Sequence, residues 1–184
     1  NLKILKTLEE WLINVTGMSA FTLPPSAGAH GELAGMMVIR KYLSEQGDPR
    51  KIVLIPDSAH GTNPASSVFC GYIPKEIPSN EEGIIEVDTL KQYLNEDVAA
   101  LMMTNPNTLG IFEKNIIEIS KVLHENGSLL YMDGANMNAF LGIVKPADLG
   151  VDVVHLNLHK TFSTPHGGGG PGTGPIGITE RMTK

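Results

Sequence analysis

The chain alternates between short apolar runs and longer segments with helical periodicity, and this alternation constrains its fold more than any other feature. The run at 51–56, KIVLIP, is rich in β-branched residues and bounded by charge and proline, as buried parallel strands are. Further strands are expected near residues 69–77, 99–104, 128–133, 151–156 and 175–179. Helices are expected from the start of the chain to Gly17, and at 28–42, 87–94 and 114–126. The pattern predicts βαβ units, and therefore an α/β fold with a mostly parallel central sheet and flanking helices.

Four polar segments follow or close the expected strands. They are 58–66 (SAHGTNPAS), 104–110 (TNPNTLG), 133–138 (DGANMN) and 155–162 (HLNLHKTF). Because ligands of such sheets bind beyond the carboxyl ends of the strands, we expect these segments to converge on one crevice. The first of them, and residues 21–30, are expected to be loops. With no internal repeat and no linker, residues 1–184 are interpreted as a single domain.

The charge balance argues against nucleic acid or an anionic membrane as a partner. Lys and Arg total 14 against 20 Asp and Glu, which gives a formal net charge of −6, and no basic cluster interrupts this balance. No apolar run is long enough to span a bilayer, and the first residues lack the apolar core of a signal peptide. The single cysteine, Cys70, fits a reducing compartment. We therefore expect a cytoplasmic protein.

Lys160 is the strongest candidate for a catalytic side chain. It stands at the end of an expected strand and is followed by a glycine-rich stretch. A lysine there can face a cofactor while its ammonium group is partly desolvated. Desolvation and nearby positive charge lower a lysine pKa, and the neutral amine is the form that attacks an aldehyde. Taken alone, however, such a lysine is more often an ordinary surface residue, so the case depends on its companions.

Those companions are the groups that a site for pyridoxal phosphate needs. Asp133, at the end of another expected strand, could bond the pyridine nitrogen and keep it protonated, which makes the ring an electron sink. His60 could stack on the ring, and Asn136 and Thr108 could each donate a hydrogen bond to the 3′-oxygen of the ring. Each of these side chains is also common in solvated loops or at helix caps, so none of them is decisive by itself.

The turn at Ala27-Gly28 is a candidate phosphate site. It precedes an expected helix, and unpaired N–H groups together with the helix dipole stabilise an anion. A plain loop before a helix is the alternative interpretation. Asn157 and His159 could add side-chain donors from the segment that carries Lys160.

Two other chemistries agree less well with the pattern. His155 and His159, with His166 and Asp133, could ligate a metal, but an H-x3-H spacing aligns two histidines only on a helix and this segment is typical of a strand. We therefore predict no metal. The run GGGGPGTG at 167–174 lacks the GK[ST] ending of a nucleotide phosphate loop, so a flexible or closely packed active-site loop explains it better.

Together, four segments resemble the pyridoxal-phosphate-dependent glycine decarboxylases of the glycine cleavage system, the P-proteins. The segments are 26–35 (SAGAHGELAG), 55–66 (IPDSAHGTNPAS), 131–139 (YMDGANMNA) and 155–177 (HLNLHKTFSTPHGGGGPGTGPIG). They occur in the family's order through most of the chain, and the last is highly specific. Within the family, the chain resembles the second subunit of the split bacterial form.

This resemblance implies the aspartate-aminotransferase-like fold, fold type I, of which residues 1–184 would form the large, cofactor-binding domain. It implies Lys160 as the Schiff-base lysine, Asp133 as the partner of the pyridine nitrogen and His60 as the stacking residue. The assignments of Asn136, Asn157, His159 and the Ala27-Gly28 turn rest on related lysine motifs. An N-terminal arm and a small C-terminal domain of the parent protein are expected to lie outside this chain.

The implied activity is that of an oxidoreductase, which decarboxylates glycine and transfers the aminomethyl group to the lipoyl group of a carrier, the H-protein. Expected partners are glycine, the lipoylated H-protein and the first subunit of the same enzyme. Because absent parts are expected to complete the substrate pocket, we expect the isolated chain to be inactive.

Two alternatives stay open. Sulfur removal from cysteine on the same fold needs a mobile nucleophilic cysteine, and only Cys70 exists, beside an expected strand that favours its burial. An assembly fragment that binds no cofactor by itself is the second alternative.

Overall fold

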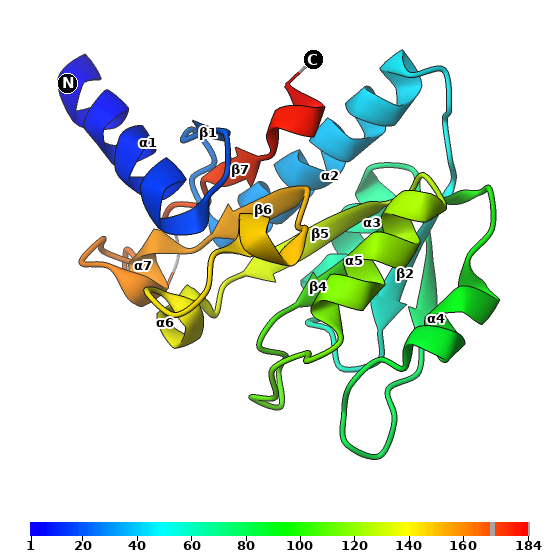
Figure 1. Ribbon diagram of the computed structural model, residues 1–184. Coiled ribbons are helices and arrows are strands. Elements are labelled where there is room, and N and C mark those ends of the chain that lie inside the picture. Colours follow the sequence, from blue (N-terminus) through cyan, green and yellow to red (C-terminus); the bar gives the residue numbers. More distant parts are fainter. Residues whose placement is uncertain (170–171, 184) are drawn as a thin grey trace.

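One seven-stranded sheet organises the computed structural model, which describes residues 1–169 and 172–183 (Figure 1). Its strands are β1 (Ala20–Thr22), β2 (Ile52–Pro56), β3 (Ile73–Ile77), β4 (Val98–Thr104), β5 (Leu129–Gly134), β6 (Val153–Leu156) and β7 (Ile176–Ile178). They lie in the order β1-β7-β6-β5-β4-β2-β3. β3, β2, β4, β5 and β6 pair in parallel, whereas β7 is antiparallel to β6 and β1 to β7. The predicted α/β fold with a mostly parallel sheet is confirmed.

The helices connect and cover these strands. They are α1 (Leu2–Thr16), α2 (Gly28–Glu45), α3 (Thr62–Phe69), α4 (Val87–Tyr93), α5 (Ile116–Glu125), α6 (Met137–Phe140) and α7 (Leu158–Thr161), with 3-10 turns η1 (Pro146–Leu149) and η2 (Glu180–Met182). α1 ends as predicted at Gly17, whose φ of 72° suits glycine. In the described ranges, none of the helices has the length and apolar character needed to cross a membrane.

The central strands β4, β5 and β6 are buried on both faces, and alternate residues of β4 belong to different cores. In β4, Leu101 and Met103 pack in the core covered by α1, α4 and α5, whereas Ala100 and Met102 pack in the core covered by α2. Every residue of β4 is buried. Successive side chains of a strand point to opposite faces of the sheet. Because both faces are buried here, apolar side chains point to both of them and the sequence run is continuously apolar.

Two expectations about loops are wrong. Residues 58–66 include the start of α3. Pro64 does not prevent this helix, because it lies in the first helical turn, where backbone N–H groups have no intrahelical acceptor and proline is tolerated. The strand expected from residue 69 accordingly begins only at Ile73. Residues 21–30 contain the end of β1, which forms by pairing Thr22 with Ile176, far away in sequence.

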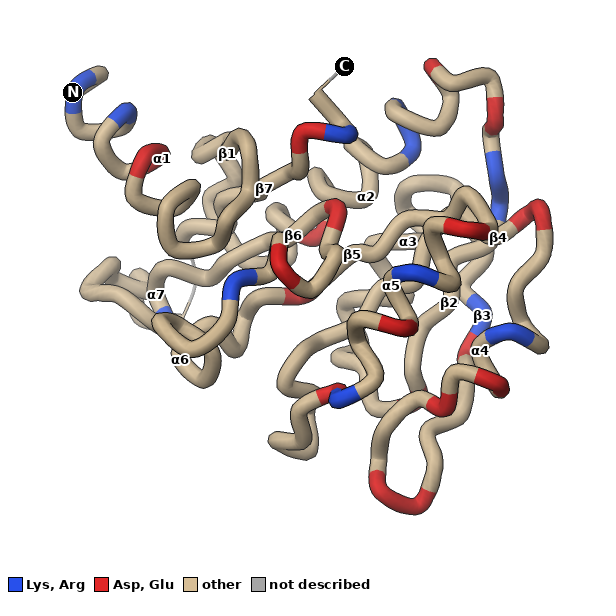
Figure 2. Tube along the Cα trace, in the orientation of Figure 1, with Lys and Arg blue, Asp and Glu red and all other residues tan. Residues whose placement is uncertain are grey.

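Charged residues are dispersed along the described trace rather than gathered on one element (Figure 2). Several ion pairs are local and exposed, such as Lys41 with Glu45 on α2, whose Nζ and Oε1 atoms lie 2.8 Å apart. Exposed pairs of this kind contribute little to stability. The fold therefore depends on its two apolar cores.

Gly35 lets α2 pack closely on the sheet, and we expect Gly35→Val to destabilise the protein by about 2–3 kcal/mol. A Cβ atom at Gly35 would lie 2.5 Å from Cε2 of Tyr131 and 3.3 Å from Cγ1 of Val153. A gain in helix propensity of a few tenths of a kcal/mol does not offset that overlap. Chemical denaturation measures the loss. Gly61→Val is the matched control, since a Cβ there meets no atom of the described residues within 4 Å, and an equal loss in both variants would contradict the packing argument.

Candidate active site

A cavity of about 380 Å³ lies where the loops after β2, β4, β5 and β6 meet the N-terminus of α2. It is lined by every site residue expected from the sequence: Lys160, His60, Asp133, Asn136, Thr108, Ala27, Gly28, Asn157 and His159. Ala29, Glu32, Thr62, Thr104, Ala135 and His166 also line it. The predicted convergence of four polar segments on one crevice is therefore confirmed. The topology explains it, because parallel strands bring their carboxyl ends to the same edge.

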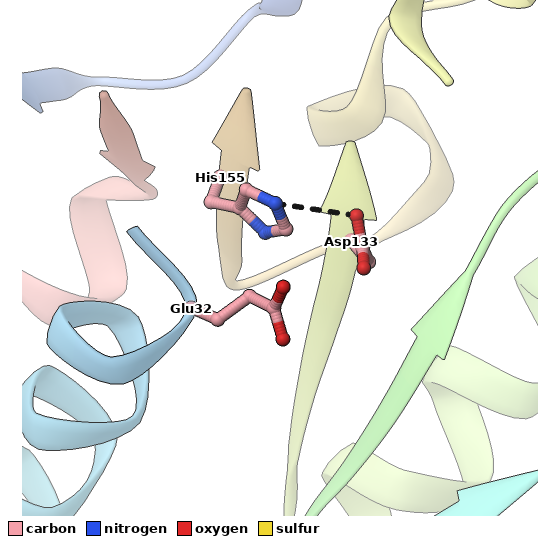
Figure 3. Close-up of side chains that lie close together, drawn as sticks. All are labelled: Glu32, Asp133 and His155. Carbon is pink, nitrogen blue, oxygen red and sulfur yellow. Dashed lines mark ion pairs between the residues drawn. The ribbon is translucent and has the colours of Figure 1, made fainter. Parts of the chain in front are cut away.

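Asp133 presents a buried, firmly held carboxylate. Its exposed fraction is 3%. Oδ1 accepts a hydrogen bond from the backbone N–H of Ala135 at 2.9 Å, and Oδ2 accepts one from the amide of Asn63 at 3.2 Å. Nε2 of His155 lies 3.3 Å from Oδ1, close enough for an ion pair but outside hydrogen-bond geometry (Figure 3). The carboxylate thus has one orientation at the cavity wall.

His155 lies behind Asp133 and is oriented by Tyr131. The Tyr131 hydroxyl is 2.7 Å from Nδ1 of His155. Burial, followed by the negative charges of Asp133 and Glu32, raises the pKa of Tyr131 well above its ordinary value, so the phenol keeps its proton. A protonated hydroxyl can donate to Nδ1 or accept from it, and only the first arrangement turns an Nε2 proton, and not a lone pair, toward the Asp133 carboxylate 3.3 Å away.

Glu32 is a buried carboxylate that the sequence-based prediction missed. It points from α2 toward Asp133 and His155 and is 5% exposed (Figure 3). Oε1 accepts a hydrogen bond from the Thr62 hydroxyl at 2.8 Å, and Oε2 accepts one from the Asn63 amide at 2.8 Å. A signal existed, because helical spacing places Glu32 on the same face as buried Met36.

Lys160 differs from its expected setting. It lies on the single turn α7, beyond the end of β6, and its backbone N–H donates to the carbonyl of Asn157 at 3.0 Å. Its side chain is exposed, so the described residues do not supply the expected desolvation. It nonetheless opens onto the same cavity as Asp133.

The N-terminus of α2 forms a cradle built by close backbone approach. The N–H groups of Gly172 and Gly174 donate to the carbonyls of Ser26 and Pro25 at 2.9 and 2.8 Å. A Cβ atom at Gly28 would lie 2.7 Å from the side-chain amide of Asn157. The first N–H groups of α2 have no intrahelical acceptor and can bind an anion. Of the glycine-rich run at 167–174, Gly170 and Pro171 lie outside the described residues.

The metal alternative gains no support from His159 and His166. Among the described residues, the donor atoms close enough to share an ion belong to Glu32, Asp133 and His155, all within 4.8 Å of one another. The amide nitrogen of Asn63 already donates to both carboxylates. A donor group at that position occupies the place that a cation would need.

His159 and His166 stack at the cavity, with ring centroids 4.4 Å apart and planes inclined by 4°. Burial, then the charges of His166 and Lys160, lowers the pKa of His159. The backbone N–H of Thr173 lies 3.2 Å from Nδ1 of His159 and donates to it. The stacked pair therefore favours a neutral His159.

We expect His166→Ala to raise the pKa of His159 toward the ordinary histidine value, because both the covering ring and its charge are removed. Titration of the histidine side chains by NMR measures the change. His124→Ala on α5 serves as the control variant and should leave the pKa of His159 as it is. A pKa of His159 that stays constant or falls in His166→Ala would show that the stacking does not exist in solution.

A model of the aminotransferase class-V family matches residues 29–169, a range that contains Glu32, Asp133 and Lys160. The chain belongs to the aminotransferase class-V family. The cavity of this class-V chain thus lies almost wholly within the matched range, with Ala27 and Gly28 just before it.

Curated relatives are more than half identical to this class-V chain over almost its whole length. The probable glycine dehydrogenase (decarboxylating) subunit 2 of Chloroherpeton thalassium is 63% identical over 183 residues, which are 100% of this chain and 37% of the relative. That of Pyrococcus furiosus is 58% identical over 180 residues, 97% of this chain and 36% of the relative. The resemblance expected from the motifs is confirmed. The chain spans little more than a third of the length of these relatives.

Solved structures of low identity show the fold. The crystal structure of glycine decarboxylase (P-protein) of the glycine cleavage system, in inhibitor-bound form, has a TM-score of 0.74 at 21% identity and covers 95% of this chain and 38% of that one. An alanine–glyoxylate aminotransferase from Nostoc sp. has a TM-score of 0.75 at 17% identity, with 99% and 46% covered. The predicted aminotransferase-like fold, fold type I, is confirmed.

Proposed function

We propose that this chain forms the cofactor site of an enzyme that decarboxylates glycine with pyridoxal phosphate and transfers the aminomethyl group to the lipoyl group of a carrier protein. The observation that carries the proposal is the meeting of Asp133, His60 and Lys160 in one cavity beside the N-terminus of α2. Relatives named as glycine dehydrogenase (decarboxylating) subunit 2 support the choice of glycine.

The residues present fit pyridoxal phosphate. The lining offers a buried carboxylate for a protonated ring nitrogen at Asp133 and an exposed primary amine at Lys160. Two buried polar atoms of lining residues, Oγ1 of Thr104 and Oδ1 of Asn157, have no hydrogen-bond partner among residues 1–169 and 172–183. Buried polar atoms without partners in a cavity favour a polar ligand there, since leaving them unpaired costs free energy.

Bound pyridoxal phosphate would supply an electron sink for the electrons released when the carboxylate of glycine is lost. Lys160 would hold the cofactor covalently and release it to the amino group of the substrate. Asp133 would keep the ring nitrogen protonated, and His60 would lie against the ring face. Asn136 and Thr108 would donate to the 3′-oxygen. The Ala27-Gly28 turn, with Asn157 and His159, would bind the phosphate.

The rest of the reaction involves partners outside this chain. We propose glycine as substrate, a lipoylated carrier of the H-protein type as acceptor, and a first subunit that completes the enzyme. In the transfer, the S–S bond of the lipoyl group breaks: one sulfur forms a C–S bond to the aminomethyl group, and the other stays on the lipoyl chain and takes up a proton to become a thiol. The carboxyl group of glycine leaves as CO2.

Sulfur removal from cysteine is less compatible with the structure. Cys70 is 4% exposed, and burial raises the pKa of its thiol despite the charge of Arg40. Sγ contacts the carbonyl oxygen of Leu33 at 3.6 Å, and Cys70 does not line the cavity. A buried thiol away from the site cannot act as the mobile nucleophile that this reaction needs.

The test uses the complete enzyme that carries this chain. Pyridoxal phosphate is added, the absorbance of its attachment to a lysine is followed, and borohydride fixes the product for peptide mapping. We expect the label on Lys160. A complete enzyme without a labelled Lys160 peptide would overturn the proposal, whereas labelling of the complete enzyme but not of the isolated chain would mean that the other parts of the protein are needed for cofactor binding.

A further inference from the structure

We propose that Glu32 is a positioning residue that fixes the tautomer and orientation of His60 through the hydroxyl of Thr62. The inference deepens the proposed function, on which its catalytic meaning rests, by stating which ring nitrogen of the stacking histidine carries the proton. It starts from a chain of polar contacts that is exposed at His60 and buried at Glu32 and Asn63.

Three contacts define the chain on the His60 side. Nδ1 of His60 lies 2.7 Å from Oγ1 of Thr62, and Oγ1 lies 2.8 Å from Oε1 of Glu32. The backbone N–H of Thr62 is also placed to donate to Nδ1, at the longer distance of 3.2 Å, and this bond needs a lone pair on Nδ1. A hydroxyl has one proton to donate, and Nδ1 carries either a proton or a lone pair, so these contacts are not independent.

The carboxylate decides between the possible arrangements. Glu32 offers only acceptor oxygens, so the Thr62 hydroxyl donates its proton to Oε1. Oγ1 can then only accept from His60, which requires the proton on Nδ1. If Nδ1 instead held a lone pair for the backbone N–H, two lone pairs would face each other across 2.7 Å. The Nδ1–H tautomer satisfies both of the shorter contacts and gives up the longer one from the backbone N–H of Thr62.

The second oxygen of Glu32 prevents an easy rearrangement. Oε2 accepts from the Asn63 amide, whose nitrogen also donates to Oδ2 of Asp133. Turning the Asn63 amide over would place its oxygen between two carboxylates, so its orientation is fixed. Asn63 is fully buried and Glu32 nearly so, which makes each unpaired atom costly. One buried carboxylate thus orients both the loop of His60 and the support of Asp133.

Substitutions of Glu32 and Thr62 should change the tautomer in a defined way. In Glu32→Gln, the new NH2 group faces Thr62, because the Asn63 amide remains a donor on the other side. The Thr62 hydroxyl then accepts from Gln and donates to Nδ1, which moves the His60 proton to Nε2. In Thr62→Val, the hydroxyl is lost and the backbone N–H becomes the partner of Nδ1, with the same result. Thr62→Ser keeps the hydroxyl and should retain the Nδ1–H tautomer.

The measurement is the 15N spectrum of ring-labelled histidine in the complete, cofactor-free protein that carries this chain, at a pH where histidine side chains are in general neutral. The His60 signal is assigned by its loss in His60→Gln. We expect Nδ1–H in the wild type, in Thr62→Ser and in Glu45→Gln, an exposed control on the same helix. We expect Nε2–H in Glu32→Gln and Thr62→Val.

A wild-type protein with Nε2–H, or a Thr62→Val variant that keeps Nδ1–H, would overturn the role of Glu32. Thr62→Val keeps the test decisive if Glu32→Gln does not fold. The proposed function is tested separately by borohydride labelling of Lys160 in the same protein. Absence of that label would overturn the cofactor assignment. The role of Glu32 would still be decided by the His60 tautomer, which is measured without cofactor.

Discussion

Lys160→Arg is expected to abolish covalent attachment of pyridoxal phosphate and to lower glycine decarboxylation by the complete enzyme about 10³-fold, a loss typical of removing a group that takes part in bond making and proton transfer. Arginine keeps the positive charge and much of the length of lysine. Its guanidinium group does not lose its proton in proteins, so it cannot attack an aldehyde. Charge and packing in the cavity are therefore nearly preserved while the nucleophile is removed.

Lys145→Arg is the matched control, because Lys145 is exposed and lies outside the cavity. It should keep both labelling and activity. Peptide mapping after borohydride reduction and release of CO2 from carboxyl-labelled glycine are the two measurements. If Lys160→Arg still forms a reducible adduct on another lysine at the wild-type level, Lys160 is not the residue that holds the cofactor.

The placement of Lys160 and Asp133 could be predicted because it depends on features that a sequence displays. Runs of β-branched and apolar residues such as 52–56 and 98–104 mark buried strands, and polar residues directly after such strands must lie at the carboxyl edge of a parallel sheet. The order of the segments, with neighbouring loops after β5 and β6, brings these two residues to one cavity.

The features that could not be predicted depend on neighbours distant in the chain. β1 exists only because it pairs with β7, and α3 begins at Thr62 although a proline in its first turn resembles a loop signal. Helical spacing indicates the buried face that carries Glu32, but the donors to both of its oxygens come from Thr62 and Asn63 in a different segment. The orientation of His155 likewise depends on a distant residue, because its hydrogen-bond partner Tyr131 lies on the adjacent strand β5. Local periodicity contains no information on such pairings.

Asp133→Asn is expected to lower glycine decarboxylation about 10²- to 10⁴-fold while leaving the covalent attachment at Lys160 in place. The substitution keeps the shape of the side chain, but a neutral amide does not hold a proton on the ring nitrogen as a carboxylate does, so the ring accepts electrons less well. Asparagine would also turn a donor toward the Asn63 amide, or lose the bond from Ala135, at a cost of about 1–3 kcal/mol in stability.

These two effects are separated by measuring three quantities on one preparation: the denaturation midpoint, the borohydride label on Lys160 and the release of CO2 from glycine. Asp148→Asn is the matched control, because Asp148 is an exposed carboxylate on η1, outside the cavity. A folded Asp133→Asn protein with full labelling and strongly reduced CO2 release would assign Asp133 to the ring nitrogen. Equal losses of labelling and CO2 release would instead show that the carboxylate acts by holding the cofactor or the fold, and the assignment would be wrong.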